Sequence, residues 1–426
     1  MKKIIETASL FSSAEAIRKS MASNLDLGYT TSPTKHIFDK NKSYFLYIHV
    51  PFCHEFCTFC TFHKFKYNES TCKEYFANVR LELLKAKEEG FSFDTLYIGG
   101  GTPLIDEKEL MLTLELAKKL FDIKEVSCES TPNHIDANIL TNFKGLIDRL
   151  SIGVQTFDNS ILKKISRYDK YGSSEILQDK ISAVVGIIPI ISLDLIFNLD
   201  MQNEEMLRHD LHIAKQLDVE QITTYPLMNS KAINQSMLEH FLTLKKSKEF
   251  ELYNIIREEL ADYSLNNAWS FSKTKTNISD EYTVTNSEYI GIGSGAFSHI
   301  NNQLHVNAYD LNQYKELVTN NTNAIIASSK LFTLKKHIQY QFLLYLFGGC
   351  VEIKKFNKLF KVNLENILKL EIFMLKRVKA IDIKKGIIYP TRFGEFLIVS
   401  MMKEFYMGMD NIRAMLRKSI MTETLN

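Results

Sequence analysis

Three cysteines constrain this chain most, because their spacing leaves few kinds of site that they can build. Cys53, Cys57 and Cys60 follow a Cys-x3-Cys-x2-Cys pattern directly after the apolar run 44–50. Three thiolates this close together can bind three corners of a cubane iron–sulfur cluster and leave one iron open to a small chelating molecule. A structural zinc site usually needs a second ligand pair after a longer loop, and no such Cys/His pair follows. The pattern therefore predicts an iron–sulfur site built for chemistry.

Charge and cysteine content indicate which partners and which cellular compartment this chain can have. With 52 Lys and Arg against 50 Asp and Glu, the net charge of +2 gives no electrostatic case for nucleic acid or an anionic membrane. Six cysteines in 426 residues do not make a disulfide framework. The longest uncharged apolar run, 183–193, is too short to span a bilayer, and the first residues lack a signal-peptide core. We expect a soluble cytoplasmic protein.

Short apolar runs alternate with longer helical patterns from residue 44 onward. This alternation is typical of successive βα units and a parallel sheet. The six expected strands are 44–50, 95–98, 125–128, 149–154, 187–197 and 220–225, and expected helices include 73–89, 108–121, 204–217 and 242–260. The pattern predicts an α/β fold, a partial (β/α)6 barrel of the TIM type.

The residues that follow each strand are the candidates for a site, because chemistry in such barrels gathers at the C-terminal ends of the strands. The second run ends in the glycine motif 99–103, which lets a ligand approach the backbone closely, and the third ends at Glu129, whose carboxylate can bind an ammonium group. The fifth contains Asp194 and the sixth ends at Tyr225. Each has an ordinary alternative. The glycine motif can be a tight turn and Glu129 a solvated glutamate. Asp194 can be bonded only to backbone, and Tyr225 can be a packed aromatic side chain.

The cysteine pattern, with Phe59 before its last cysteine, resembles the radical S-adenosylmethionine (radical SAM) superfamily. Within it, Tyr47-Ile-His-Val-Pro-Phe-Cys53 is similar to the HemN-like family, typified by oxygen-independent coproporphyrinogen III oxidase. Further matching segments follow in the family's order at 99–103, 129–132, 149–157 and 289–298. The resemblance implies a 4Fe-4S cluster on the three cysteines, with S-adenosylmethionine chelating the fourth iron and undergoing one-electron cleavage to methionine and a 5'-deoxyadenosyl radical.

The resemblance also implies roles for single residues. The glycine motif and Glu129 contact the amino group of S-adenosylmethionine, and Arg167 pairs with its carboxylate. The implied cofactor-binding residues are Tyr47, Phe59, Gly100, Gly101, Thr102, Glu129, Gln155, Arg167, Asp194, Gly293 and Ala296, and the implied catalytic residues are Tyr47, Gln155 and Tyr225. The chain departs from the family pattern at Ser166, Asp169 and Asn198.

Composition and resemblance together divide the chain into four parts. Residues 1–43 form a polar N-terminal extension, 44–300 the radical SAM core with its cofactor-binding loops, and 301–332 a connecting segment. Beyond residue 333, Leu, Phe, Lys and Ile recur at helical spacing. Residues 333–426 resemble the family's small C-terminal domain, which is mainly helical with a short β element.

The resemblance implies a tetrapyrrole substrate and a reducing electron donor of the flavodoxin or ferredoxin type. Oxidative decarboxylation of coproporphyrinogen III is the leading prediction. Oxidases of this family usually continue Cys-Gly-Cys at the end of the cluster motif, whereas this chain has Cys60-Thr61-Phe62. Two alternatives stay open: a HemN-like methyltransferase acting on haem or another planar substrate, and a haem-binding chaperone without turnover.

Overall fold

The computed structural model describes residues 27–29, 39, 41–228, 247–274, 288–320 and 323–423. Most of the predicted N-terminal extension, 1–43, lies outside these residues.

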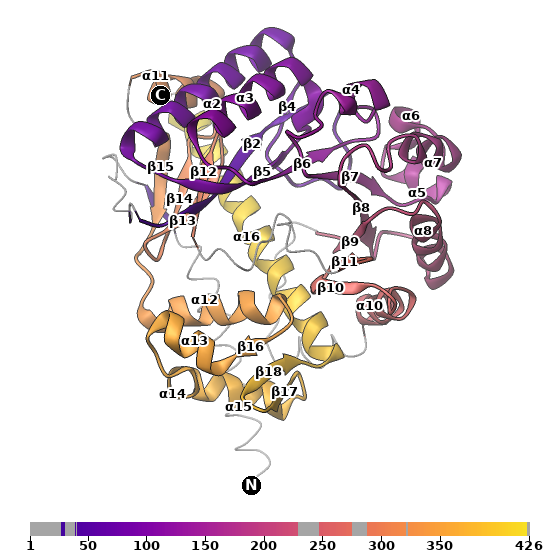
Figure 1. The fold of residues 1–426 in the computed structure, drawn as a ribbon, viewed down its shortest axis with the longest axis vertical. Helices are drawn as coiled ribbons and strands as arrows, with labels where there is room; N and C mark the ends of the chain where they lie inside the picture. The colour runs from indigo at the N-terminus through magenta and orange to yellow at the C-terminus, as the bar shows by residue number, and fades with distance from the viewer. Residues whose placement is uncertain are drawn as a thin grey trace.

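Six parallel strands form the central part of the molecule (Figure 1). More than half of the residues in each strand are buried, including six of the seven in the first, because helices or loops cover both faces of a parallel sheet. In sheet order the strands are β2 (Tyr44–Val50), β5 (Phe93–Gly100), β6 (Glu125–Ser130), β7 (Arg149–Gln155), β8 (Ile190–Phe197) and β9 (Gln221–Pro226). The predicted α/β fold with a parallel-strand barrel is confirmed.

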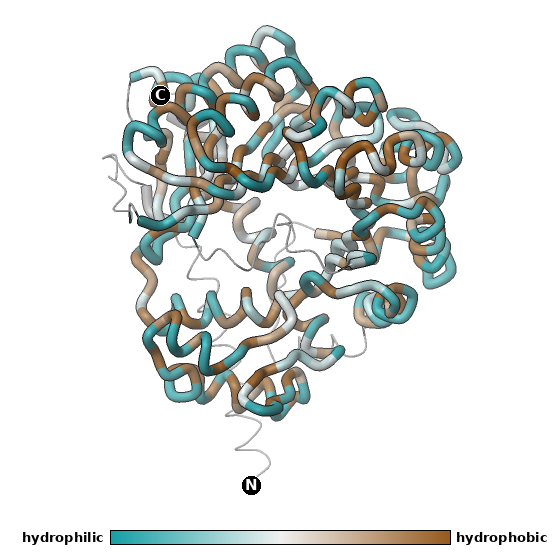
Figure 2. Tube along the Cα trace, in the orientation of Figure 1, coloured by the Kyte–Doolittle hydropathy of each residue, from teal (hydrophilic) through white to brown (hydrophobic). Residues whose placement is uncertain are grey.

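Helices return the chain between these strands and lie along the outer side of the curved sheet (Figure 1). Side chains cap several of them: Asn68, Asp106 and Asn203 each accept a backbone N–H of the first turn. The connecting elements are α2 (Glu69–Glu89), η1 (Pro103–Ile105), α3 (Glu107–Leu120), α4 (Ala137–Thr141), α5 (Asn159–Lys164), α6 (Tyr168–Tyr171), α7 (Ser174–Ser182) and α8 (Glu204–Gln216), and α10 (Lys248–Glu259) follows β9. Hydrophilic and hydrophobic residues alternate along the outer helices in Figure 2, as expected of helices with one face on a sheet.

The sheet continues beyond both edges of these six strands, with one further strand that pairs with β2 in parallel and with antiparallel strands beyond it and next to β9. Next to β9 lie β11 (Ser270–Ser272) and β10 (Ser264–Asn267), and next to β2 lie, in order, β12 (Tyr289–Ile292), β13 (Phe297–Ile300), β14 (Gln303–Asn307), β15 (Ile325–Ser329) and β1 (Leu27–Tyr29). Helix α11 (Leu311–Thr319) packs against α2. Residues 301–332, expected to be a connecting segment, therefore supply β14, α11 and β15 to the main body of the fold.

The C-terminal region is mainly helical, as predicted. It contains α12 (Leu334–Phe347), α13 (Ile353–Phe360), α14 (Leu364–Ile367), α15 (Lys369–Arg377) and α16 (Arg392–Glu423), with a small antiparallel sheet of β16 (Val351–Glu352), β18 (Ile387–Pro390) and β17 (Ile381–Lys384). Helix α16 packs on α12 and also touches α10 and β9 of the main body (Figure 1). Among the described helices, none is long and apolar enough to cross a membrane.

Candidate functional site

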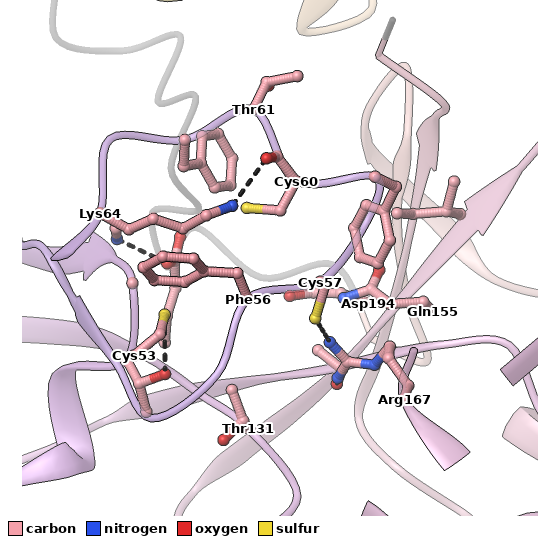
Figure 3. Close-up of a pocket in the computed structure, with 18 of the residues that line it drawn as sticks. Cys53, Phe56, Cys57, Cys60, Thr61, Lys64, Thr131, Gln155, Arg167 and Asp194 are labelled. Carbon is pink, nitrogen blue, oxygen red and sulfur yellow. Dashed lines mark hydrogen bonds between the residues drawn. The ribbon is translucent and has the colours of Figure 1, made fainter. Parts of the chain in front are cut away.

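The three predicted cluster ligands lie on one loop at the C-terminal end of β2. Two short strands, β3 (Phe52–Cys53) and β4 (Phe65–Lys66), pair in parallel and hold the two ends of this loop together. All three cysteines are free thiols, line one pocket and surround the same space in Figure 3. Within the described ranges, no three His, Cys, Asp or Glu side chains are grouped closely enough to hold a single metal ion. Three thiols on one loop are a donor set that suits a cluster, because a cluster takes its thiolates on separate irons.

The pocket around these cysteines sits at the C-terminal ends of the parallel strands and holds about 1070 Å³ of empty space, part of it open to solvent. Aromatic and aliphatic side chains form much of its wall. They are Phe56, Phe59, Phe62, Tyr171, Ile196, Tyr225, Pro226 and Met228. An apolar wall with a few convergent polar groups is the usual composition of a site for an organic ligand.

The glycine motif after β5 brings backbone against the cysteine loop. Gly100 adopts φ +118°, a conformation that favours glycine, and its N–H donates to Glu129. At Gly101 a Cβ atom would lie 2.5 Å from the carbonyl oxygen of Phe52, so a side chain there would displace the start of the loop. The Thr102 hydroxyl lies 3.8 Å from the Cys53 sulfur. The motif thus supports the loop as well as lining the pocket.

Glu129 is a carboxylate held in place at the end of β6. Its Oε1 accepts the Tyr97 hydroxyl at 2.7 Å, and its Oε2 accepts the Gly100 N–H at 2.9 Å. Burial raises the pKa of Glu129 to about 7, because few waters solvate its charged form. A cation bound beside this carboxylate would replace the missing solvation and favour the ionised state.

Gln155 and Arg167 face the pocket from the end of β7 and from the segment before α6. Gln155 has φ +78°, follows an irregularity in the β7–β8 pairing, and lies so close to Gly153 that a Cβ there would be 2.7 Å from its Nε2. Arg167 is 4% exposed; it donates through Nη2 to the Gly153 carbonyl and through Nη1 to the Cys57 sulfur at 3.3 Å. Its buried Nε has no hydrogen-bond partner among the described residues. Such an orphan donor beside a pocket fits an anionic ligand group.

Asp194 is connected to a buried cation inside the barrel. Its Oδ1 accepts the Ser151 hydroxyl at 2.7 Å, and the Ser151 oxygen accepts Arg149 Nη2 at 3.2 Å. Arg149 is fully buried and also donates to Gln221 at 2.5 Å. The side chain of Asp194 is therefore oriented from below by a polar chain that crosses three neighbouring strands.

Three predicted residues do not line the pocket. The Tyr47 hydroxyl pairs with His49 Nδ1 at 2.8 Å, and the Tyr47 ring stacks on Tyr97 with centroids 6.2 Å apart. Gly293 and Ala296 are also absent from the pocket lining, and a Cβ on Gly293 would meet the Tyr75 hydroxyl at 2.4 Å. The other twelve predicted site residues, which include Tyr225 and Phe59, do line it.

The structure also places residues at the site that sequence reasoning did not select. Lys64 lines the pocket and donates to the Cys60 carbonyl at 2.7 Å, and Lys170 reaches the Cys57 sulfur at 3.6 Å. Asp210, buried on α8, accepts the Phe157 N–H at 2.6 Å and thereby anchors the turn that follows Gln155. Asp210 was detectable, since it falls on the buried face with Leu207 and Ala214. The two lysines carried no such periodic signal.

Comparison with known proteins gives the same family as the motifs. The model of the radical SAM superfamily matches residues 47–213. The heme chaperone HemW of Bacillus subtilis is 28% identical over 286 residues, which are 64% of this chain and 75% of HemW. Anaerobilin synthase of Escherichia coli O157:H7 is 24% identical over 314 residues, 68% of this chain and 67% of that protein.

A solved structure shows the same overall fold. The radical SAM enzyme coproporphyrinogen III oxidase (HemN) of Escherichia coli superimposes with a TM-score of 0.66 over 87% of this chain and 90% of that one, at 19% identity. The superfamily uses a 4Fe-4S cluster and S-adenosylmethionine, and most of the residues predicted to bind them here line one pocket. Residues 47–213 thus form a radical SAM domain, the superfamily of which uses these two cofactors, and the chain as a whole has the fold of HemN.

Proposed function

We propose that this chain binds a haem-type tetrapyrrole beside S-adenosylmethionine, in the pocket at the mouth of the barrel. The observation that carries the proposal is the aromatic wall, which includes Phe56, Phe59 and Phe62 and continues from the cysteine loop along the pocket. Flat aromatic rings stack favourably on a planar conjugated macrocycle. The wall thus offers a planar ligand a surface next to the place where the cofactors sit.

The residues of the pocket fit the two cofactors. Three thiols on one loop suit a cluster with an open iron, and burial raises the pKa of the Cys53 thiol to about 11, so that metal binding must displace its proton. Glu129 would hold the ammonium group of S-adenosylmethionine and the orphan Nε of Arg167 its carboxylate. Asp194 would accept the ribose hydroxyls. When bound, cluster and cofactor supply one-electron cleavage and removal of a substrate hydrogen.

The protein's own contribution is position and exclusion of water. Glu129 and Gln155 stand near the ends of β6 and β7, and Asp194 lies within β8, so their spacing is set by the sheet. Tyr47 supports Glu129 from behind through Tyr97, against which it stacks. The apolar wall keeps water away from the reacting atoms.

Haem handling is the first candidate activity. The names of several relatives favour it, since the heme chaperone HemW of Lactococcus lactis also matches, at 25% identity over 75% of this chain and 86% of that protein. The residues after Cys60, Thr61 and Phe62, depart from the Cys-Gly-Cys of the oxidases.

Turnover of a tetrapyrrole is the second candidate, with decarboxylation of coproporphyrinogen III as its leading form and methylation of a planar substrate as its alternative. Turnover is favoured by the three polar side chains that face the same pocket, Glu129, Gln155 and Arg167. A protein that only carried haem would have no need to orient S-adenosylmethionine with so many polar groups. An electron donor of the flavodoxin or ferredoxin type would supply the reducing electron, and a reducing cytoplasm would preserve the cluster.

Anaerobic assays of the reconstituted protein separate these candidates. Haem and coproporphyrinogen III are each incubated with dithionite and S-adenosylmethionine, and products are followed by mass spectrometry. Stoichiometric binding of haem that stays unchanged supports haem handling without turnover. Release of carbon dioxide from coproporphyrinogen III, or formation of a methylated or ring-opened haem, supports turnover. If the protein neither binds nor converts either tetrapyrrole, the proposal is refuted.

A pair of matched variants tests the aromatic wall. Phe56 is 47% exposed at the pocket, and Phe373, on α15, is 61% exposed, so neither truncation threatens the core. We expect Phe56→Ala to weaken haem binding about tenfold, by loss of a ring contact of roughly 1.5 kcal/mol, and Phe373→Ala to leave it unchanged. Equal haem affinities for the two variants would place the macrocycle elsewhere.

A further inference from the structure

We propose that Lys170 is a positioning residue that sets the reduction potential of the cluster by donating a charged hydrogen bond to the sulfur of Cys57. The inference rests on the proposed ligation of the cluster by the three cysteines. It assigns a function to a residue on α6 that belongs to none of the motifs and does not line the pocket.

The environments of the three sulfur atoms differ. The Cys57 sulfur receives two cationic donors, Arg167 Nη1 at 3.3 Å and Lys170 Nζ at 3.6 Å. The Cys53 sulfur lies 3.8 Å from a neutral hydroxyl, that of Thr102. Near Cys60 the nearby lysine, Lys64, donates to the backbone carbonyl instead (Figure 3). Positive charge with donor hydrogens is therefore concentrated on Cys57.

The contact of Lys170 is placed so that it can persist when a cluster is bound. Arg167 lines the pocket together with Cys57, whereas Lys170 is not among the lining residues although its Nζ contacts the same sulfur. Its backbone is held by Asn133, whose Nδ2 donates to the Lys170 carbonyl at 2.8 Å, and Lys180 in turn donates to the Asn133 oxygen at 3.0 Å. A cluster could thus occupy the pocket without displacing this lysine.

A cation hydrogen-bonded to a thiolate ligand favours the reduced cluster, because reduction adds a negative charge to the iron–sulfur unit. Two exposed carboxylates lie nearby, Glu55 on the pocket rim and Asp169 beside Lys170, and partly offset the positive charge. Because these carboxylates offset part of the charge, we expect Lys170 to raise the equilibrium constant for reduction of the cluster about tenfold. For a one-electron couple, a tenfold change is about 59 mV.

The test is a reductive titration of the reconstituted full-length protein, followed by electron paramagnetic resonance of the reduced cluster. Lys170→Met should make the cluster about tenfold harder to reduce, and Lys170→Gln, which remains polar, should act in the same direction. Lys170→Arg should stay within twofold of the wild type, because it keeps a cationic donor. The matched control is Lys164→Met, which removes the same charge from an exposed position on α5.

The outcomes separate this inference from the proposed ligation. A wild-type protein that assembles no 4Fe-4S cluster overturns the ligation, and the inference with it. The inference alone is overturned by a second outcome. In that outcome the wild-type cluster gives normal signals, and the reduction potentials of Lys170→Met and Lys170→Gln equal that of Lys164→Met.

Discussion

Asp210 gives the sharpest prediction, because a carboxyl group is buried beneath the turn that carries Gln155. Its oxygens accept the Phe157 N–H at 2.6 Å and the Thr156 hydroxyl at 2.9 and 3.1 Å, and its side chain is fully buried. Burial, with a smaller contribution from the charge of Asp158, raises the pKa of Asp210 from 3.8 to about 7. Replacement of Asp210 by Asn keeps an oxygen for the Phe157 N–H but removes the titration.

The sign of the pH dependence follows from the raised pKa. Between about pH 4 and pH 7 the folded protein holds a proton on Asp210 that the unfolded chain has lost, so the free energy of unfolding falls as pH rises. The full change from 3.8 to about 7 corresponds to about 4 kcal/mol. Between pH 5 and pH 8 we expect Asp210→Asn to gain roughly 2 to 3 kcal/mol of stability relative to the wild type.

Urea unfolding at pH 5 and pH 8 measures this difference. The chain has one tryptophan, Trp269, which is buried against Tyr225 and Phe347, so its fluorescence reports loss of the packed core. The control is Asp122→Asn, which makes the same substitution at a side chain that is 87% exposed. If the stability difference between Asp210→Asn and the wild type were the same at both pH values, the buried titration would be refuted.

Three further predictions follow from the site. Glu129→Gln should weaken S-adenosylmethionine binding about tenfold in calorimetry without loss of the cluster, since it removes a charge but keeps the shape; unchanged affinity would contradict the proposed role. Gly101→Ala should lower both cluster content and thermal stability, because its Cβ would lie 2.5 Å from the Phe52 carbonyl oxygen. Arg149→Met should cost roughly 3 kcal/mol in urea unfolding, since it removes a buried cation that orders Ser151; a cost below about 1 kcal/mol would refute this.

The core of the fold was predictable because local signals agreed with the tertiary structure. Continuous apolar runs bounded by glycine or polar residues marked the six parallel strands, and the fold rule for barrels then placed Glu129, Gln155 and Asp194 at one end. The added antiparallel strands were missed, since segments such as β10 (Ser264–Asn267) are short and polar. Only their pairing partners make them strands.

Contacts between distant segments could not be predicted in the same way. Lys170 is separated from Cys57 by 113 positions, and nothing in its local sequence distinguishes it from exposed lysines nearby. Tyr47 and Gly293 were expected in the cofactor pocket, but in the structure they are not among its lining residues. Their predicted contacts with S-adenosylmethionine stay predictions, as do the roles of the residues that line the pocket.

The most direct test of the account is whether the three cysteines hold a cluster with an iron open to S-adenosylmethionine. Reconstituted protein, reduced with dithionite, is measured by electron paramagnetic resonance before and after addition of S-adenosylmethionine, beside a Cys57→Ala variant. We predict about four irons per chain, a reduced-cluster signal that changes when S-adenosylmethionine is added, and loss of both cluster and response in the variant. A signal that does not respond to S-adenosylmethionine, or an unchanged cluster in Cys57→Ala, would contradict the account.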